Sequence, residues 1–181
     1  MRKTLVINTM GEPSAGKSAS AHGLMYKLRC NNVLAEYVPE FAKWLTWRKD
    51  ESIACQQYIL GVMLRDLEML NGKVDVIVTD GPLLLAAYYN IRYANGKYDT
   101  KAFTDLAISA YKSFNNLTLF LERKHPFEQA GRNQSEEEGP KIRRELRMLC
   151  LEYGIEYVDM VTNDANLNIV VDNYLKGMYS A

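Results

Sequence analysis

Short apolar runs recur along the chain, and each is followed by a longer stretch in which apolar and polar positions alternate at helical spacing. The runs occupy residues 5–10, 33–38, 74–80, 116–122 and 155–160. They are nearly continuous and rich in β-branched residues, which is typical of strands buried on both faces of a parallel sheet. The pattern therefore predicts an α/β fold with a five-stranded parallel sheet and helices on both faces.

The intervening stretches predict the helices. Pro39 suits a first helical turn, and Asn71-Gly72 is a good stop for the helix before it. The expected helices run from the first loop to about residue 29, from near residue 39, and over about 52–70, 82–93, 100–114, 136–153 and 166–179. No linker, repeat or low-complexity tract interrupts this order, so we expect a single domain over residues 1–181.

Composition narrows the function classes. Hydrophobic residues make up 48% of the chain, charged residues 24%, and the formal net charge is zero. A strongly basic nucleic-acid binder is therefore disfavoured, and any basic groove for nucleic acid would be local. Cys30, Cys55 and Cys150 match no metal-binding spacing, so we expect reduced thiols. The first apolar run is too short for a signal peptide and no run could span a bilayer, so we expect a cytoplasmic protein without a membrane partner.

The stretch GEPSAGKS, residues 11–18, follows the first predicted strand and opens a helical pattern. It fits G-x-x-x-x-G-K-[ST], in which backbone N–H groups and the start of a helix surround phosphate oxygens. Lys17 is expected to reach the β- and γ-phosphates, and the Ser18 hydroxyl to ligate Mg²⁺. The residues expected to contact ATP are Gly11, Glu12, Pro13, Ser14, Ala15, Gly16, Lys17, Ser18 and Ala19.

Asp80 ends the third apolar run, in VIVTDGP. An acid in this place beside a phosphate loop is expected to hold Mg²⁺, directly or through water. The alternative is a cap for the helix that begins near Pro82, and one side chain can serve both purposes.

Three classes of protein use such a loop, and the rest of the chain favours a kinase. A GTPase would carry N-K-x-D after the fourth strand, where this chain has ERKHPFEQAGRNQSEEEG. A motor ATPase would carry a glutamate beside the acid of the third strand, where this chain has Gly81. The remaining interpretation is a kinase, a protein with a P-loop NTPase fold that transfers a phosphoryl group to another molecule.

The segment 123–141 lies between the fourth strand and a helix and is polar and glycine-containing. In a kinase it would form a lid that excludes water and supplies an arginine to the transferring phosphoryl group. Arg132 is the first candidate for that role and Arg123 the second. The alternative is a solvated surface loop whose Ser-Glu-Glu-Glu starts the next helix.

The acceptor hydroxyl needs a general base near the carboxyl edge of the sheet, where open α/β sheets bind ligands. Glu36, Glu40 and Asp80 are the candidates. Glu40, in VPEFAKW just after the second strand, is the preferred one, and the alternative for any one glutamate is a solvated helix charge.

The ordered set GEPSAGKS, EFAK, QQYI, VIVTDGP and FLER followed by GRNQSEEE resembles the NadR-type nicotinamide riboside kinases and the related P-loop ATPase/kinase domains of bacteriophages. The resemblance implies ATP, Mg²⁺ and phosphorylation of a hydroxyl on a nucleoside-type acceptor. It implies that Gln57 lies on the acceptor wall, and that Lys43 replaces an arginine beside Glu40. The residues assigned to the substrate are Glu36, Glu40, Lys43, Gln57 and Arg123.

The acceptor stays open at this point. The resemblance to phage kinases makes 5-hydroxymethyluracil in DNA the leading candidate, with the host cytoplasm as the compartment. A base could stack on tyrosines while cations hold flanking phosphates. The tyrosines are Tyr88, Tyr89, Tyr93 and Tyr98, and the cations are Lys43, Arg48, Lys49, Arg92, Lys97 and Lys101. The alternatives are a free nucleoside or nucleotide such as nicotinamide riboside, and a regulatory module that binds ATP without catalysis.

Overall fold

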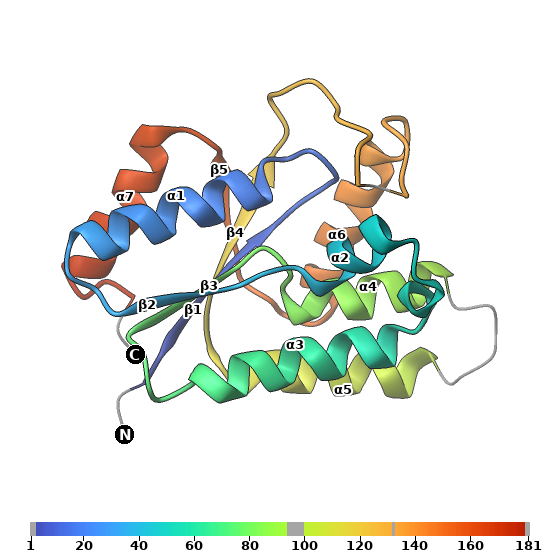
Figure 1. Cartoon of the computed structure of the whole chain (residues 1–181), viewed down its shortest axis with the longest axis horizontal. Helices are drawn as coiled ribbons and strands as arrows, with labels where there is room; N and C mark the ends of the chain where they lie inside the picture. The colour runs from blue at the N-terminus through green and yellow to red at the C-terminus, as the bar shows by residue number, and fades with distance from the viewer. Residues whose placement is uncertain (1–2, 94–99, 132, 180–181) are drawn as a thin grey trace.

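All five predicted strands form, and they pair in one parallel sheet (Figure 1). The computed structural model describes residues 3–93, 100–131 and 133–179. The strands are β1 (Leu5–Met10), β2 (Ala35–Val38), β3 (Val76–Thr79), β4 (Asn115–Glu122) and β5 (Val158–Val161). Their order across the sheet is β2-β3-β1-β4-β5. The predicted α/β class and the parallel five-stranded sheet are confirmed.

Helices cover both faces of the sheet, as predicted. They are α1 (Lys17–Cys30), α2 (Phe41–Arg48), α3 (Gln56–Leu70), α4 (Leu83–Tyr93), α5 (Thr100–Lys112), α6 (Gly139–Glu152) and α7 (Asp164–Leu175). Figure 1 shows α1 and α7 together on one face, with α3, α4 and α5 on the other. The buried residues divide in the same way, into one cluster that includes α1 and α7 and one that includes α3 to α6.

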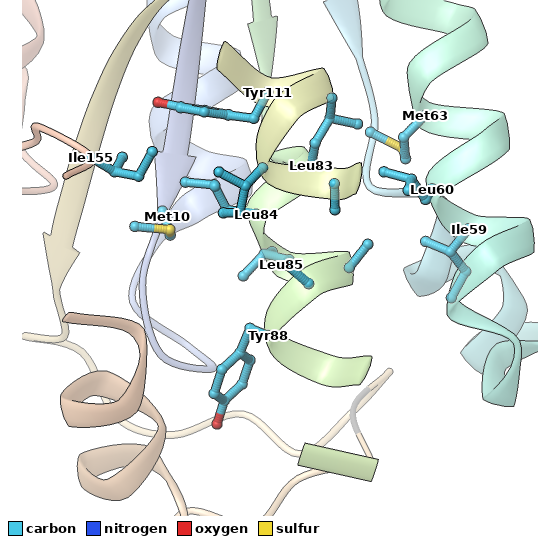
Figure 2. Close-up of a cluster of buried hydrophobic side chains, with 14 of the residues drawn as sticks. Met10, Ile59, Leu60, Met63, Leu83, Leu84, Leu85, Tyr88, Tyr111 and Ile155 are labelled. Atoms are coloured by element: carbon cyan, nitrogen blue, oxygen red, sulfur yellow. The ribbon is translucent and has the colours of Figure 1, made fainter. Parts of the chain in front are cut away.

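The larger cluster holds the first turns of α4, and the end of this helix contributes residues to the candidate site. At the start of α4, Leu83, Leu84 and Leu85 are 2%, 0% and 6% exposed, so this turn is surrounded by other side chains. Figure 2 shows these leucines between β1 and α3, with Tyr88 one turn further along. Because the first two turns of α4 are buried, the residues beyond Tyr88 are held at a defined place near the carboxyl edge of the sheet.

Several element boundaries differ from the sequence prediction. The helix expected over 52–70 is broken at Cys55, which has an extended backbone, into a short 3₁₀ helix (Glu51–Ala54) and α3. The Asp50 carboxylate accepts the Ser52 N–H at 2.9 Å and so caps the start of the 3₁₀ helix. The last helix begins earlier than expected because the Asn163 side chain accepts the Asn166 N–H at 2.8 Å. Such caps compete with periodicity in setting helix ends.

The cysteines are free, and their reactivity should differ. Cys30 and Cys55 are exposed, whereas Cys150 is buried and its burial raises its pKa to about 11. A raised pKa leaves less thiolate at mildly alkaline pH, and thiolate is the reactive form. We expect a thiol reagent to label Cys30 and Cys55 quickly and Cys150 only after unfolding, as counted by mass spectrometry. Equal labelling rates for all three would contradict the packing of α6.

Within the described residues, the structure contains no helix that combines the length and the apolar character needed to cross a membrane.

Candidate functional site

The strand order brings the phosphate loop and Asp80 together. β1 pairs with β3, and Asn8 lies opposite Thr79 in the register. The loop leaves β1 and Asp80 leaves β3 at the same carboxyl edge. Ser18 and Asp80, which are 62 residues apart in sequence, therefore become immediate neighbours.

The loop itself depends on two glycines with positive φ. Gly11 has φ 153° and Gly16 has φ 88°. A Cβ at Gly11 would lie 2.7 Å from the Leu121 carbonyl oxygen, and one at Gly16 would lie 2.5 Å from Thr162 Oγ1. Only glycine fits this backbone, which is wedged between the ends of β4 and β5.

Residues 13–19 line one wall of a cavity of about 680 Å³. The wall includes the first turn of α1, whose N–H groups have no acceptor within the helix and favour an anion. The Lys17 ammonium donates to the carbonyl oxygens of Gly11 and Glu12, both at 3.3 Å, so it lies alongside the loop. These donors and this charge fit a polyphosphate.

Asp80 connects the loop to β2 and α2. Its carboxylate is buried, and one oxygen accepts the Ser18 hydroxyl at 2.5 Å. The other accepts the Tyr37 hydroxyl at 2.7 Å and the Glu40 N–H at 2.8 Å. Burial, followed by the hydrogen bond to Asp80, raises the pKa of Tyr37. Ser18 and Asp80 thus present adjacent oxygens, the ligand type that Mg²⁺ prefers.

Glu40 and Lys43 face the same cavity from α2. Glu40 is the residue before the helix begins, and its charge contributes to the raised pKa values of Tyr37 and Tyr89. The Lys43 ammonium donates to Ser18 Oγ at 3.4 Å. The structure therefore brings Glu40, Lys43, Ser18 and Asp80 together.

Other sequence-predicted residues lie elsewhere. Glu36 is exposed on the edge strand β2. Gln57 accepts from Cys55 Sγ at 3.6 Å, and its neighbour Gln56 is the glutamine that lines the cavity and is buried. The helical spacing alone did not distinguish these two adjacent glutamines. The Glu12 side chain is buried and directed toward α6, where Oε1 lies 3.6 Å from Arg143 Nη1.

The segment 123–138 covers the cavity, and Figure 1 shows it arching from the end of β4 to the start of α6. The Glu128 N–H donates to Ser14 Oγ at 3.0 Å, and Gln134 Nε2 donates to the Tyr93 hydroxyl at 3.3 Å. The segment thus contacts the phosphate loop and α4. It ends earlier than the expected boundary at residue 141 because α6 begins at Gly139, followed by a proline in the first turn.

The two arginines expected on this lid have different outcomes. Arg123 Nη1 donates to Glu136 at 2.7 Å, and its guanidinium lies 5.8 Å from the centre of the Phe127 ring. Its charge is therefore paired within the segment 123–138 and is not directed at the cavity by any of these contacts. Arg132 lies outside the described residues, so its role stays a prediction.

Two tyrosines form one wall of the cavity, and the sequence analysis did not distinguish them from the other tyrosines nearby in sequence. Tyr89 and Tyr93 line the cavity, with ring centroids 5.8 Å apart and planes within 2°. Burial raises the pKa of Tyr89, and the Glu40 charge adds to the effect. Tyr88 instead belongs to the core and donates to Glu145 at 2.7 Å. The i, i+4 spacing of 89 and 93 is the signal that could have found this wall.

Some cations expected to hold flanking phosphates are already engaged. Arg92, with 13% of its side chain exposed, pairs with Glu138 at 2.5 Å and with Glu145 at 2.8 Å. It joins α4 to α6 and the turn before it. Lys101 pairs with Asp105 on its own helix. Lys97 and Tyr98 lie outside the described residues.

Comparison with protein families adds one finding. Residues 6–166 match the family model described as AAA domain. The chain belongs to the AAA domain family. This P-loop family supports nucleotide binding by the loop of residues 11–18, and it includes ATPases that are not kinases as well as domains compatible with phosphotransfer. A search of curated proteins finds no match to the chain.

In this AAA domain the residue after Asp80 is Gly81, and the space there does not accommodate a side chain such as that of glutamate. A Cβ at Gly81 would lie 2.8 Å from the Glu40 Cα and 3.1 Å from Met63 Cε. We expect Gly81→Ala to displace Glu40, the predicted general base, and to lower turnover by about 10²-fold, since small misplacements of a catalytic group cost that much. Nucleotide affinity should change little, and kcat and the nucleotide Kd measure the two effects.

The matched control is Gly61→Ala on α3, because a Cβ there meets no atom within 4 Å. Equal turnover in both alanine variants would show that the close approach of Gly81 to Glu40 does not position the site.

Proposed function

We propose that the chain is an ATP-dependent kinase that transfers the γ-phosphoryl group to a hydroxyl of a nucleoside-type acceptor. The observation that carries this proposal is a shared cavity. The phosphate loop forms one wall, Glu40 stands beside it, and Tyr89 and Tyr93 form an aromatic wall beneath the segment 123–138. A phosphate site and an aromatic site with a carboxylate between them suit a donor and an acceptor held together.

The donor half uses the loop, Lys17 and the Ser18–Asp80 pair. The N–H groups at the start of α1 and the Lys17 ammonium bind phosphate oxygens. Ser18 and Asp80 would hold Mg²⁺, which supplies neutralisation of phosphate charge when bound. The network around Asp80 keeps these groups in place, since it joins Ser18 to Tyr37 and to the start of α2.

The acceptor half uses Glu40 and the tyrosine wall. Glu40 accepts the proton of the attacking hydroxyl, the task of a general base. The raised pKa of Tyr89 keeps its phenol protonated and able to donate a hydrogen bond. Tyr93 and Tyr89 offer ring faces on which a base can stack. The segment 123–138 excludes water, and Arg132 is the lid arginine we propose.

Among acceptors, 5-hydroxymethyluracil in phage DNA is the leading candidate. The support is the resemblance of the motifs to phage kinases, together with the aromatic wall of Tyr89 and Tyr93 beside Glu40, the proposed general base. A free nucleoside or nucleotide such as nicotinamide riboside is the alternative, because the same wall would bind it. A regulatory ATP-binding module is a third candidate and would leave Glu40 without a chemical role.

The test compares ADP formation with and without acceptors. A kinase should hydrolyse ATP slowly alone and form ADP much faster with nucleoside-containing acceptors, because the lid protects the phosphoryl group from water. A rate that is the same with every acceptor would indicate an ATPase. No ADP formation at all, despite nucleotide binding, would indicate the regulatory module.

A further inference from the structure

Both tryptophans of the chain lie exposed on the short helix α2. Trp44 is 53% exposed and Trp47 is 56% exposed, while Leu45 on the opposite side is buried and anchors the helix. Tryptophan side chains usually bury most of their surface. Two exposed indoles on one eight-residue helix therefore indicate a contact surface.

Positive charge surrounds the two indoles. Lys43, Arg48 and Lys49 are exposed, and the range 41–49 contains no acidic residue. Helical spacing places Lys43 beside Trp47 and Trp44 beside Arg48, each at i, i+4. The nearest acids in sequence are Glu40, which lines the cavity, Asp50, whose carboxylate accepts the Ser52 N–H, and Glu51, which is exposed. We call the face formed by Lys43, Trp44, Trp47, Arg48 and Lys49 the α2 platform.

The α2 platform continues directly into the cavity. Lys43 belongs to both, since it lines the cavity and donates to Ser18 Oγ at 3.4 Å. Gly131 of the segment 123–138 lies against the Trp47 indole, so closely that a Cβ there would be 2.8 Å from Cε2 of the ring. This contact places the Trp47 ring next to a residue that lines the cavity, while more than half of Trp47 stays exposed.

We propose that the α2 platform binds a single-stranded nucleic-acid segment whose acceptor nucleotide enters the cavity. Bases next to the acceptor stack on Trp44 and Trp47, and Arg48 and Lys49 bind the phosphates between them. Exposed aromatic faces interleaved with cations are the arrangement that binds unstacked strands with little sequence preference. The proposal rests on the proposed function for the reacting nucleotide, but strand binding by the platform can be measured without any phosphotransfer.

Other occupants fit the charges less well. A membrane surface would contact a longer amphipathic helix with a continuous apolar side, whereas α2 has eight residues and buries Leu45 against the protein. The overall net charge of zero also means that the positive charge of this face is local. A strand that enters the neighbouring phosphate-binding cavity uses the platform and the cavity together.

The test uses tryptophan fluorescence, because the only tryptophans of the chain are on the platform. A mixed-sequence DNA oligonucleotide in single-stranded form should quench the fluorescence of the full chain. With Arg48 and Lys49 at phosphates, log K should fall with log salt at a slope of about −1.4. Trp44→Ala should weaken oligonucleotide binding by about 5- to 100-fold, with Trp47 as the remaining reporter. The double variant Arg48→Ala/Lys49→Ala should reduce the salt slope.

Controls separate this proposal from the kinase proposal. Tyr26→Ala on α1 is the matched control, because Tyr26 is 72% exposed and outside the platform, and it should bind the oligonucleotide as wild type does. Trp44→Phe should recover much of the affinity if stacking is the cause. Binding of a fluorescent ATP analogue should be the same in all these variants, which also shows that they fold.

Each outcome decides one point. Oligonucleotide binding that is absent, or equal in the wild type and the platform variants, overturns the platform while leaving transfer to a free nucleoside as a separate result. Quenching by anionic phospholipid vesicles but not by the oligonucleotide would assign the platform to a membrane. Platform-dependent strand binding without phosphotransfer would support the platform and contradict the kinase.

Discussion

Replacing Lys17 with alanine should abolish phosphotransfer while the fold survives. The Lys17 ammonium lies alongside the loop, on the carbonyl oxygens of Gly11 and Glu12, where it can reach phosphate oxygens. Removing a charge that stabilises the transferring group costs at least about 10²- to 10³-fold in rate. The loop backbone should persist, because Gly11 packs closely against Leu121 of β4 and Gly16 against Thr162, and these contacts do not involve the Lys17 side chain. Acceptor-dependent ADP formation measures the loss.

The control for this variant is Lys73→Ala. Lys73 is exposed in the turn after α3, and α3 leads into β3 from the opposite edge of the sheet. It should retain full activity, and circular dichroism should show the same helix content in both variants. Full activity in Lys17→Ala would remove the assignment of residues 11–18 as the donor site.

Replacing Glu40 with glutamine should slow transfer by about 10²- to 10⁴-fold, the usual contribution of a general base. Glutamine keeps the size of the side chain, and the backbone N–H of residue 40 can still donate to Asp80. What the variant loses is the negative charge that accepts the hydroxyl proton. We expect kcat to fall while the nucleotide Kd stays nearly constant, because Glu40 is not part of the phosphate loop.

Glu36→Gln is the matched control, because Glu36 lies on the preceding strand but is exposed. Near-wild-type turnover in Glu40→Gln would move the role of base to Asp80 or Glu36. A loss in Glu36→Gln equal to that in Glu40→Gln would indicate that the charge of the sheet edge matters, and not one positioned carboxylate.

Much of the fold followed from the sequence because periodicity reports burial directly. The strand β1, the phosphate loop and Asp80 were found from an apolar run, a spaced motif and an acid after an apolar run. In the structure β3 lies next to β1 in the sheet. The hydrogen bond of 2.5 Å between Ser18 and Asp80 is therefore a consequence of the strand order. The sequence pattern contained the parts but not this order.

The acceptor side could not be predicted as well, because its residues are selected by side-chain direction. Gln56 and not Gln57 lines the cavity, and Tyr89 and Tyr93 line it while Tyr88 is in the core. These choices depend on the rotation of α3 and α4 against the sheet, which the packing of leucines such as Leu84 determines (Figure 2). The ion pairs of Arg92 could not be predicted either, because its partners Glu138 and Glu145 are distant in sequence.

The most direct test of the account follows the γ-phosphoryl group itself. The protein is given γ-labelled ATP with two acceptor sets, one of free nucleosides and nucleotides and one of single-stranded DNA with and without 5-hydroxymethyluracil, and Lys17→Ala is the blank. The account predicts label on an acceptor hydroxyl, with the hydroxymethylated DNA as the leading acceptor. Label recovered only as inorganic phosphate, at the same rate in every mixture, would contradict it.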